Sequence, residues 1–454
     1  MKITTLLTLL LGTGAIAQTP FFHDDTATGS YFGYQTKMAG NEMLVSTGAY
    51  MFNPTNYSAP TVVLYEKTPS DIAQRHVFSQ PDGLATDGFG SSIALEGENV
   101  AIGAPYNEDG AVYTFKRNGD TWDFFQKITS GDLVTANDRF GTVALHGDYL
   151  FIGAPEDDIE SPNNDNFGSV HVYQYNGSEW FFLTKLVVPG TLNFGSRIKA
   201  ENDFLAVGSV GAIHIFKLVS GLWEYQGSSP AIETLRDFVL QNNEMYVVEG
   251  YSTQQIEVFD YTQLNWQPTA TVPAQYNDQL ISTVEVLGDN MFVGSDGYIL
   301  QMMRKFPLQY FKKINGTWTF QNVFYGNSST GDDDFFGKSI SGYGDNLVIG
   351  APGQTLPIHT GMAYYLNMQE LGVDHFNNVQ IALFPNPVVK MLSIGGIDPN
   401  AIAKIEVRSL TGQLIFASRN TTADVDLSAI SSGVYLLTIY LDSGITIHRK
   451  VIKN

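Results

Sequence analysis

Apolar and polar residues alternate in short runs along most of this chain, and the stretch from Phe89 to Ile128 shows the pattern most clearly. It contains four alternating runs separated by polar segments that include Glu96–Asn99 and Arg117–Asp120, and the second run ends in the triplet Gly103-Ala104-Pro105. Alternation with a period of two, interrupted by Gly, Asn and Asp, predicts a four-stranded antiparallel meander. Such a sheet has two faces to bury, so we expect it to recur.

The Phe-Gly pair that opens this stretch does recur. The pairs begin at Phe32, Phe89, Phe140, Phe194 and Phe336, with intervals of 57, 51, 54 and 142 residues. The last interval leaves room for two degenerate units. We place one unit over residues 237–266, and another over residues 281–318 with its third strand at 298–302. The sequence therefore predicts seven units.

Two further features repeat at fixed places within the units. The Gly-Ala-Pro triplet begins at Gly103, Gly153 and Gly350, with weaker versions at Gly208 and Gly294. A tryptophan opens the fourth strand at Trp122, Trp180, Trp223, Trp266 and Trp318, which are all five tryptophans of the chain. A large ring at one place per unit fits packing between neighbouring sheets, and the glycines fit close backbone approaches. Radial repetition of such sheets predicts an all-β fold, a seven-bladed β-propeller of four-stranded antiparallel sheets.

These units resemble the FG-GAP repeats of integrin-α-type seven-bladed propellers, over roughly Tyr31 to Leu371. In that family, calcium-binding units carry an Asp-x-Asp-x-Asp-Gly loop between strands one and two. Here the corresponding loops are short hairpins, such as Gly97-Glu98-Asn99 and Gly288-Asp289-Asn290. We therefore predict no metal and no cofactor, and the sequence leaves open whether calcium binds at a non-standard loop.

The seventh unit lacks the strand that carries the tryptophan. Either Thr19–Asp25 or Gln369–Phe376 could supply it and close the ring, and the sequence alone does not decide between them.

Composition and charge narrow the classes of partner. Charged residues make up 16% of the 454 residues, below the roughly 25% that is typical of soluble proteins. The net charge is −21, and residues 1–380 carry −23 of it against +2 for the remainder. The electrostatic field of this negative charge repels nucleic acid and anionic membrane surfaces. The absence of cysteine excludes disulfides, thiolate metal sites and a cysteine nucleophile.

The two ends of the chain carry targeting signals. Residues 1–17 combine Lys2, an apolar run and the ending Ala15-Ile16-Ala17, which predicts a cleaved secretory signal. No other stretch is apolar enough for a membrane span. From residue 18 to 376 we expect the propeller.

Residues 377–454 predict a small Ig-like β-sandwich of alternating runs. Its FPNP, EVRSLTGQLI and LSAISSGVYLLTI segments and its basic ending closely resemble the C-terminal (type A) sorting domain of the type IX secretion system of Bacteroidota. That resemblance implies the type IX machinery as a partner of residues 377–454. It also implies a protein that is secreted or held at the outer cell surface.

Acidic residues gather in the loops that join strands two and three and in those between units, which lie at one end of the ring. We predict a ligand-binding face there, because propellers usually bind partners with one face. Its residues are Glu108, Asp109, Glu156, Asp157, Asp158, Asp165, Asp332, Asp333 and Asp334.

Catalytic motifs are missing from the sequence. The eight histidines show no metal-binding spacing, and there is no Gly-x-Ser-x-Gly elbow or phosphate-binding loop. His171 and His214 stand at matching places on third strands, which favours core positions. We therefore predict no catalytic residues, and a non-enzymatic binding or adhesion protein that engages a glycan or a surface protein. The alternatives are an extracellular carbohydrate-active hydrolase using carboxylates of the acidic face, and a structural surface component without a specific ligand.

Overall fold

The computed structural model describes residues 18–22, 30–48, 60–84, 86–131, 137–158, 166–250, 255–263, 266–275, 281–295, 307–326, 335–353, 361–370, 382–395, 402–409, 413–418, 424–441 and 446–454. The chain divides into two compact units, one of residues Gln18–Met368 and a C-terminal one that includes Gln369–Asn454. The predicted signal segment 1–17 and the predicted boundary between residues 376 and 377 lie outside the described residues.

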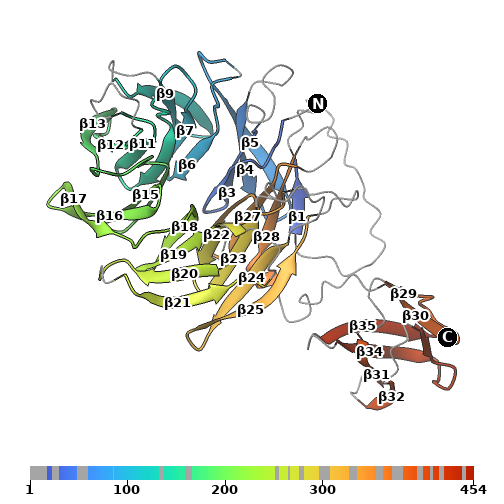
Figure 1. The fold of residues 1–454 in the computed structure, drawn as a ribbon. Helices are drawn as coiled ribbons and strands as arrows, with labels where there is room; N and C mark the ends of the chain where they lie inside the picture. The colour runs from blue at the N-terminus through green and yellow to red at the C-terminus, as the bar shows by residue number, and fades with distance from the viewer. Residues whose placement is uncertain are drawn as a thin grey trace, which may run out of the picture. The chain divides into compact units, whose positions relative to one another are not determined.

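The first unit is a propeller of seven four-stranded antiparallel sheets in the described part of the chain (Figure 1). The first strands are β2 (Thr36–Ala39), β6 (Ser92–Glu96), β10 (Thr142–His146), β14 (Arg197–Glu201), β18 (Leu235–Gln241), β22 (Ile281–Leu287) and β26 (Ser339–Tyr343). The second strands are β3 (Glu42–Ser46), β7 (Asn99–Ala104), β11 (Tyr149–Ala154), β15 (Phe204–Ser209), β19 (Glu244–Glu249), β23 (Asn290–Ser295) and β27 (Asn346–Ala351). The third strands are β4 (Thr61–Lys67), β8 (Ala111–Asn118), β12 (Ser169–Tyr175), β16 (Ala212–Val219), β20 (Gln255–Asp260), β24 (Leu308–Ile314) and β28 (Met362–Asn367). The fourth strands are β5 (Ile72–Ser79), β9 (Thr121–Thr129), β13 (Trp180–Leu186), β17 (Leu222–Ser228), β21 (Pro268–Pro273), β25 (Thr317–Phe324) and β1 (Gln18–Phe21).

The ring closes through the N-terminal strand. Each first strand contacts the first strands of both neighbouring sheets, including β26 with β2. The outer strand of the seventh sheet is β1, which pairs antiparallel with β28 in the register Gln18↔Leu366. The side chain of Phe21 reaches the next sheet, where its ring meets Tyr65 at 4.9 Å between centroids. Of the two closing segments that the sequence left open, the N-terminal one supplies the strand.

The Phe-Gly and Gly-Ala-Pro motifs meet where two sheets adjoin. Within one sheet, the N–H of Gly90 donates to the carbonyl of Gly103 over 3.0 Å. Between sheets, a Cβ atom on Gly103 would lie 1.9 Å from the carbonyl oxygen of Gly141, and one on Gly153 would lie 2.1 Å from that of Gly195. Because this contact is backbone to backbone, a side chain has no room, which explains the glycines of both motifs.

The tryptophans fill the spaces between sheets, as predicted. Each of three indole rings meets an aromatic ring of the preceding sheet edge to face, an arrangement that adds to the gain from burial. The pairs are Trp122 with Phe78 at 5.8 Å, Trp223 with Phe151 at 5.2 Å and Trp318 with Tyr246 at 5.7 Å between ring centroids. Trp266 departs from the pattern, because it precedes β21 instead of opening it.

One predicted strand was wrong. The third strand of the sixth sheet is β24, Leu308–Ile314, instead of residues 298–302. It pairs with both β23 and β25. A tight turn at Asn315-Gly316, where both residues have positive φ, joins it to the tryptophan strand. The segment 298–302 lies outside the described residues. Its apolar residues are typical of a strand, but the Asn315-Gly316 turn does not adjoin it.

The C-terminal unit is a two-sheet sandwich. One sheet contains β29 (Ala382–Phe384), β30 (Met391–Gly395) and β33 (Asp424–Asp426). The other contains β32 (Leu414–Ser418), β31 (Ile402–Ser409), β34 (Gly433–Leu441) and β35 (Thr446–Lys453). Buried side chains of both sheets form one core, with Leu392 and Val425 facing residues such as Leu437. This confirms the predicted sandwich. A short 3-10 helix, η2 (Met368–Glu370), follows the last propeller strand.

Candidate functional site

The two ends of the propeller differ in their connections. At one end, two-residue turns join strands one and two, with positive φ at Gly97, Gly147, Gly288 and Gly344, as expected for tight hairpins. We call this the hairpin end. At the other end, which we call the FG end, lie the Phe-Gly pairs and the loops between strands two and three, because Ser92 pairs with Gly103 and Ala104 pairs with Ala111. The predicted ligand-binding face belongs to the FG end.

Two of the predicted acidic residues are buried and serve the fold. The carboxylate of Asp157 accepts hydrogen bonds from the ammonium group of Lys185 over 2.7 Å and from the hydroxyl of Ser169. Asp158 Oδ1 accepts the backbone N–H of Asn166 over 3.0 Å. Both side chains are almost fully shielded from solvent. These interactions hold the two ends of the loop that begins after β11.

The other predicted residues have varied surroundings. Glu156 forms an ion pair with Arg139, and Asp109 Oδ1 accepts the N–H of Asn137 over 3.1 Å. Glu108 is exposed, with a positive φ of 51°. The remaining four, Asp165, Asp332, Asp333 and Asp334, lie outside the described residues. Their part in a binding face stays a prediction.

A row of aromatic and basic side chains at the FG end was missed by the sequence reasoning. The row consists of Tyr34, Tyr106 and Arg139, which come from the first three sheets. Tyr34 lines a crevice together with Gly88, and a Cβ atom on Gly88 would lie 2.6 Å from the ring of Tyr106. The guanidinium carbon of Arg139 lies 4.8 Å from the centroid of the Tyr106 ring. We call these three residues the Tyr34–Arg139 row. All three residues are half-buried.

Hydrogen bonds beneath the row fix the loop that carries Tyr106. The buried carboxylate of Asp87 accepts from Asn107 Nδ2 over 2.6 Å and from Gln80 Nε2 over 2.8 Å. The N–H of Tyr106 donates to the backbone carbonyl of Asp87 over 3.0 Å. A surface held in this way loses little conformational entropy when a partner binds.

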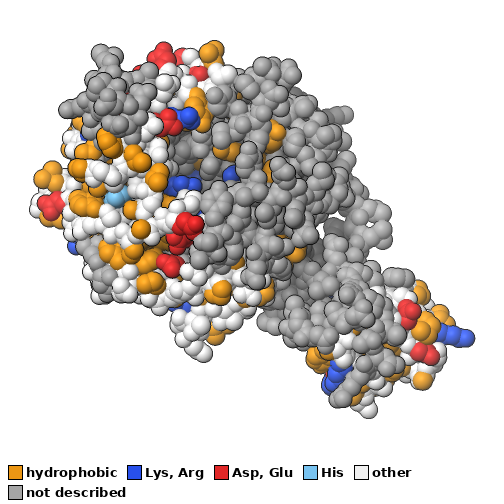
Figure 2. Space-filling model, viewed as in Figure 1, with side chains coloured by type: hydrophobic (Ala, Val, Ile, Leu, Met, Phe, Trp, Pro, Cys, Tyr) orange, Lys and Arg blue, Asp and Glu red, His pale blue; other side chains and the backbone are white. Residues whose placement is uncertain are grey.

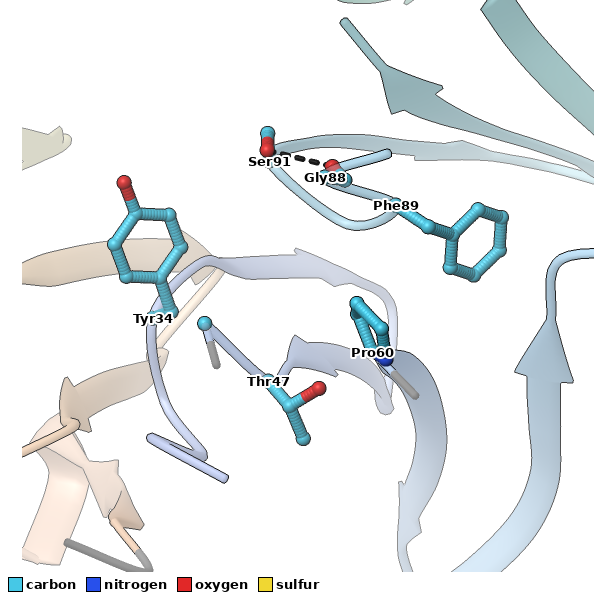
Figure 3. A pocket seen from close by; sticks show the side chains of 7 residues that line it. Tyr34, Thr47, Pro60, Gly88, Phe89 and Ser91 are labelled. Atoms are coloured by element: carbon cyan, nitrogen blue, oxygen red, sulfur yellow. Dashed lines mark hydrogen bonds between the residues drawn. The ribbon is translucent and has the colours of Figure 1, made fainter. Parts of the chain in front are cut away.

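A narrow crevice separates the first two sheets beside Tyr34. Its walls include Tyr34, Thr47, Pro60 and Phe89 (Figure 3), and the hydroxyl of Ser91 donates to the carbonyl of Gly88 over 2.6 Å. The free space is about 10 Å³, roughly what one water molecule needs. Burial raises the pKa of Tyr34 to about 12, so the phenol is a neutral hydrogen-bond donor. A ligand would therefore lie across this face instead of entering it.

A simple sequence signal marks two members of the row. Tyr34 directly follows Phe32-Gly33, and Tyr106 directly follows Gly103-Ala104-Pro105. Both motifs end at the FG end, so an aromatic residue placed just after either motif belongs to this face.

The two histidines on third strands lie in the core, as predicted. Both are almost fully buried. The ring of His171 meets Phe140 edge to face at 5.1 Å, and that of His214 meets Phe194 at 5.3 Å. His214 Nε2 lies 2.9 Å from Ser209 Oγ, and Nδ1 lies 2.8 Å from Ser228 Oγ. Desolvation lowers the pKa of His214 to about 4.

Among the described residues, no three His, Asp or Glu side chains are placed to share a metal ion. In the same ranges, no helix has the length and apolar character to cross a bilayer.

Comparisons with known proteins agree with the repeats and the C-terminal domain. Residues 73–115 and 122–173 match the family described as FG-GAP repeat, and residues 382–454 match the family described as secretion system C-terminal sorting domain. A search of curated proteins finds no match. The chain therefore carries FG-GAP repeats and a type IX sorting domain, as the sequence resemblance implied, and is exported to the cell surface or the extracellular space.

A solved structure with a similar fold is that of PorZ, described as an essential bacterial surface component of the type-IX secretion system of Porphyromonas gingivalis. The two chains are 12% identical with a TM-score of 0.53, over 94% of this chain and 60% of the PorZ chain. This chain thus spans 60% of the length of its structural relative, and at such identity the likeness concerns the fold alone.

Proposed function

We propose that this exported propeller is a non-catalytic binding protein that engages its ligand through the FG end. The observation that carries the proposal is the Tyr34–Arg139 row, which presents two phenol rings and a guanidinium group on a pre-organised face. Tyrosine and arginine dominate binding energy in protein interfaces, because they offer large, rigid contact areas together with hydrogen bonds. The sorting domain delivers this face outside the cell.

The proposed ligand is a neutral polysaccharide. Aromatic faces stack on the apolar faces of sugar rings, and nearby carboxylates such as Glu108 and Asp109 accept hydrogen bonds from hydroxyl groups. The net charge of −21 disfavours acidic glycans at this surface. The small crevice beside Tyr34 supports a ligand that lies along the face, in contact with several loops.

No resident cofactor forms part of this proposal. The hydrolase alternative requires two carboxylates on either side of one scissile bond. The described carboxylates of the acidic face do not favour it, since Asp157 bonds to Lys185 and Glu156 pairs with Arg139.

The test compares glycan binding by the exported chain and by variants at each end of the ring. Tyr34→Ala and Tyr106→Ala should each weaken binding to a glycan array about tenfold or more, because stacking on an aromatic face contributes on the order of 1–2 kcal/mol. The matched control is Tyr343→Ala, which removes a tyrosine of 57% exposure at the hairpin end. That variant should bind like the wild type.

Two results would overturn the proposal. One is equal loss of binding in Tyr343→Ala and in the two FG-end variants. The other is wild-type capture of a protein partner, with no glycan bound. Thermal melting of each variant separates loss of the site from loss of the fold.

A further inference from the structure

The first strands of the seven sheets surround the axis of the ring, and their backbone needs partners there. Each first strand is an edge of its sheet, so alternate N–H groups have no neighbouring strand. Side chains from the preceding sheet accept these bonds. Ser92 Oγ accepts from Val143 N over 3.0 Å, Asp237 Oδ2 from Val284 N over 3.2 Å, and Ser341 Oγ from Met38 N over 3.0 Å.

Equivalent residues of the first strands stand at the same level of the ring, because each strand ends at the same kind of hairpin. The third residue from the end of each strand defines one such level, which we call the lysine level. Its members are Lys37, Ala94, Ala144, Lys199, Val239, Glu285 and Ser341. Two members act as acceptors for the next sheet, Ser341 as above and Glu285 for the N–H of Gly342 over 2.8 Å.

Lysine cannot accept a hydrogen bond, so Lys37 and Lys199 do not fill the acceptor role at this level. The neighbours of Lys37 on its strand, Thr36 and Met38, are buried, whereas Lys37 itself is accessible to solvent. Lys37 interacts electrostatically with both Lys199 and Glu285, which come from the fourth and sixth sheets. Side chains of the first, fourth and sixth sheets can meet only around the axis. Figure 2 shows lysine or arginine side chains in the hollow at the centre of the ring.

Without a bound anion, the surroundings of the Lys37 and Lys199 ammonium groups are electrostatically unfavourable. Although Lys37 is accessible to solvent, desolvation by the surrounding protein lowers its pKa, and the charge of Lys199 lowers it further. Burial likewise raises the pKa of Glu285. Neither lysine forms an ion pair with a described residue. Two ammonium groups thus converge with one carboxylate at a level whose other members carry no charge, and the carboxylate of Glu96, two residues beyond this level in β6, also acts on Lys37. An anion between the lysines would relieve their repulsion.

We propose that the axial channel binds a small oxyanion between the ammonium groups of Lys37 and Lys199. Carboxylate, phosphate and sulfate share the needed chemistry, since each offers several oxygen acceptors and a negative charge for charge-assisted hydrogen bonds. Three members of this level, Ala94, Ala144 and Ser341, have short side chains. This site is separate from the FG-end face and does not depend on its ligand.

Calorimetric titration of the full exported chain tests the proposal with three probes: inorganic phosphate, sulfate and glucuronate, each at constant ionic strength. We expect saturable binding of at least one probe, and which probe binds identifies the anion. Lys37→Ala and Lys199→Ala should each weaken it about tenfold or more, since each removes one charge-assisted pair. Alanine already occupies the same level in Ala94 and Ala144, so both variants should fold. The matched control, Lys312→Ala, removes an exposed lysine of β24 and should bind like the wild type.

The repulsion gives a second readout that needs no ligand. Without anion, Lys37→Ala should melt at or above the wild-type temperature, because it removes one of two neighbouring positive charges. Lack of saturable binding for all three probes would overturn the proposal. So would binding that survives in the double variant Lys37→Ala/Lys199→Ala.

Discussion

The buried His214 makes the stability of the propeller depend on pH. Its imidazole is 2% exposed, between the hydroxyl groups of Ser209 and Ser228. Desolvation lowers its pKa from 6.5 to about 4 in the folded protein. In the unfolded chain the same imidazole binds a proton near its ordinary pKa. Acid therefore favours the unfolded state, because only that state takes up the proton easily.

The size of the effect follows from the two pKa values. The stability that depends on a neutral His214 is fully present above the pKa of the imidazole in the unfolded chain. It is lost as the pH falls toward the pKa of the imidazole in the folded protein. The gap of about 2.5 pKa units corresponds to roughly 3 kcal/mol, and about 2 kcal/mol of this is lost by about pH 5. Such a loss is a large fraction of the stability of a typical domain.

Urea unfolding of the wild type and of His214→Gln, at about pH 7.5 and about pH 5, measures this contribution. Glutamine keeps hydrogen-bonding groups for the two serines and cannot take up a proton in this range. Tryptophan fluorescence reports on the propeller alone, since all five tryptophans belong to it. Between the two pH values, the free energy of unfolding should fall by about 2 kcal/mol more in the wild type than in the variant. Equal losses in both proteins would refute the reasoning.

Three further predictions concern the packing of the ring, its closure and calcium binding. Gly153→Ala should lower the free energy of unfolding, measured in urea, by about 2 kcal/mol or more, because its Cβ would meet backbone. Gly208→Ala should lower it clearly less, because its Cβ would meet the end of the Leu235 side chain. Equal losses in the two variants would contradict the backbone contact. Phe21 in β1 is 7% exposed, so Phe21→Ala should lower the free energy of unfolding by about 3 kcal/mol. Phe22 is 61% exposed, so Phe22→Ala should leave it nearly unchanged. An unchanged free energy of unfolding in Phe21→Ala would argue against closure of the ring by β1. Millimolar calcium should leave the melting temperature unchanged, and a clear rise would reveal a calcium site that stabilises the native state.

The repeat could be predicted from the sequence because its markers are local. The Phe-Gly pairs, the Gly-Ala-Pro triplets and the tryptophans recur at nearly constant spacing, and each has a physical role within one sheet or at its border. The closing strand β1 has only four residues, so its own pattern is too short to distinguish it from the other candidate segment.

The candidate site was harder to predict, because its contacts join distant parts of the chain. Asp157 looks like a surface acid in sequence, and its partner Lys185 comes from β13, beyond an intervening strand. The lysine level is likewise invisible locally, since Lys37 and Lys199 lie three sheets apart and meet only because the ring closes. The positions of Tyr34 and Tyr106 could have been predicted from the sequence, because each residue follows a motif whose place in the sheet was already assigned.

The central claim, that the exported propeller binds its ligand at the FG end, is tested most directly by hydrogen–deuterium exchange of the full chain with and without the bound glycan. Slower amide exchange should appear in residues 30–35, 86–91 and 104–110, which carry or adjoin the Tyr34–Arg139 row. The hairpin turns at 96–99 and 146–149 should exchange at unchanged rates. Protection confined to those turns, or to residues 382–454, would contradict the account.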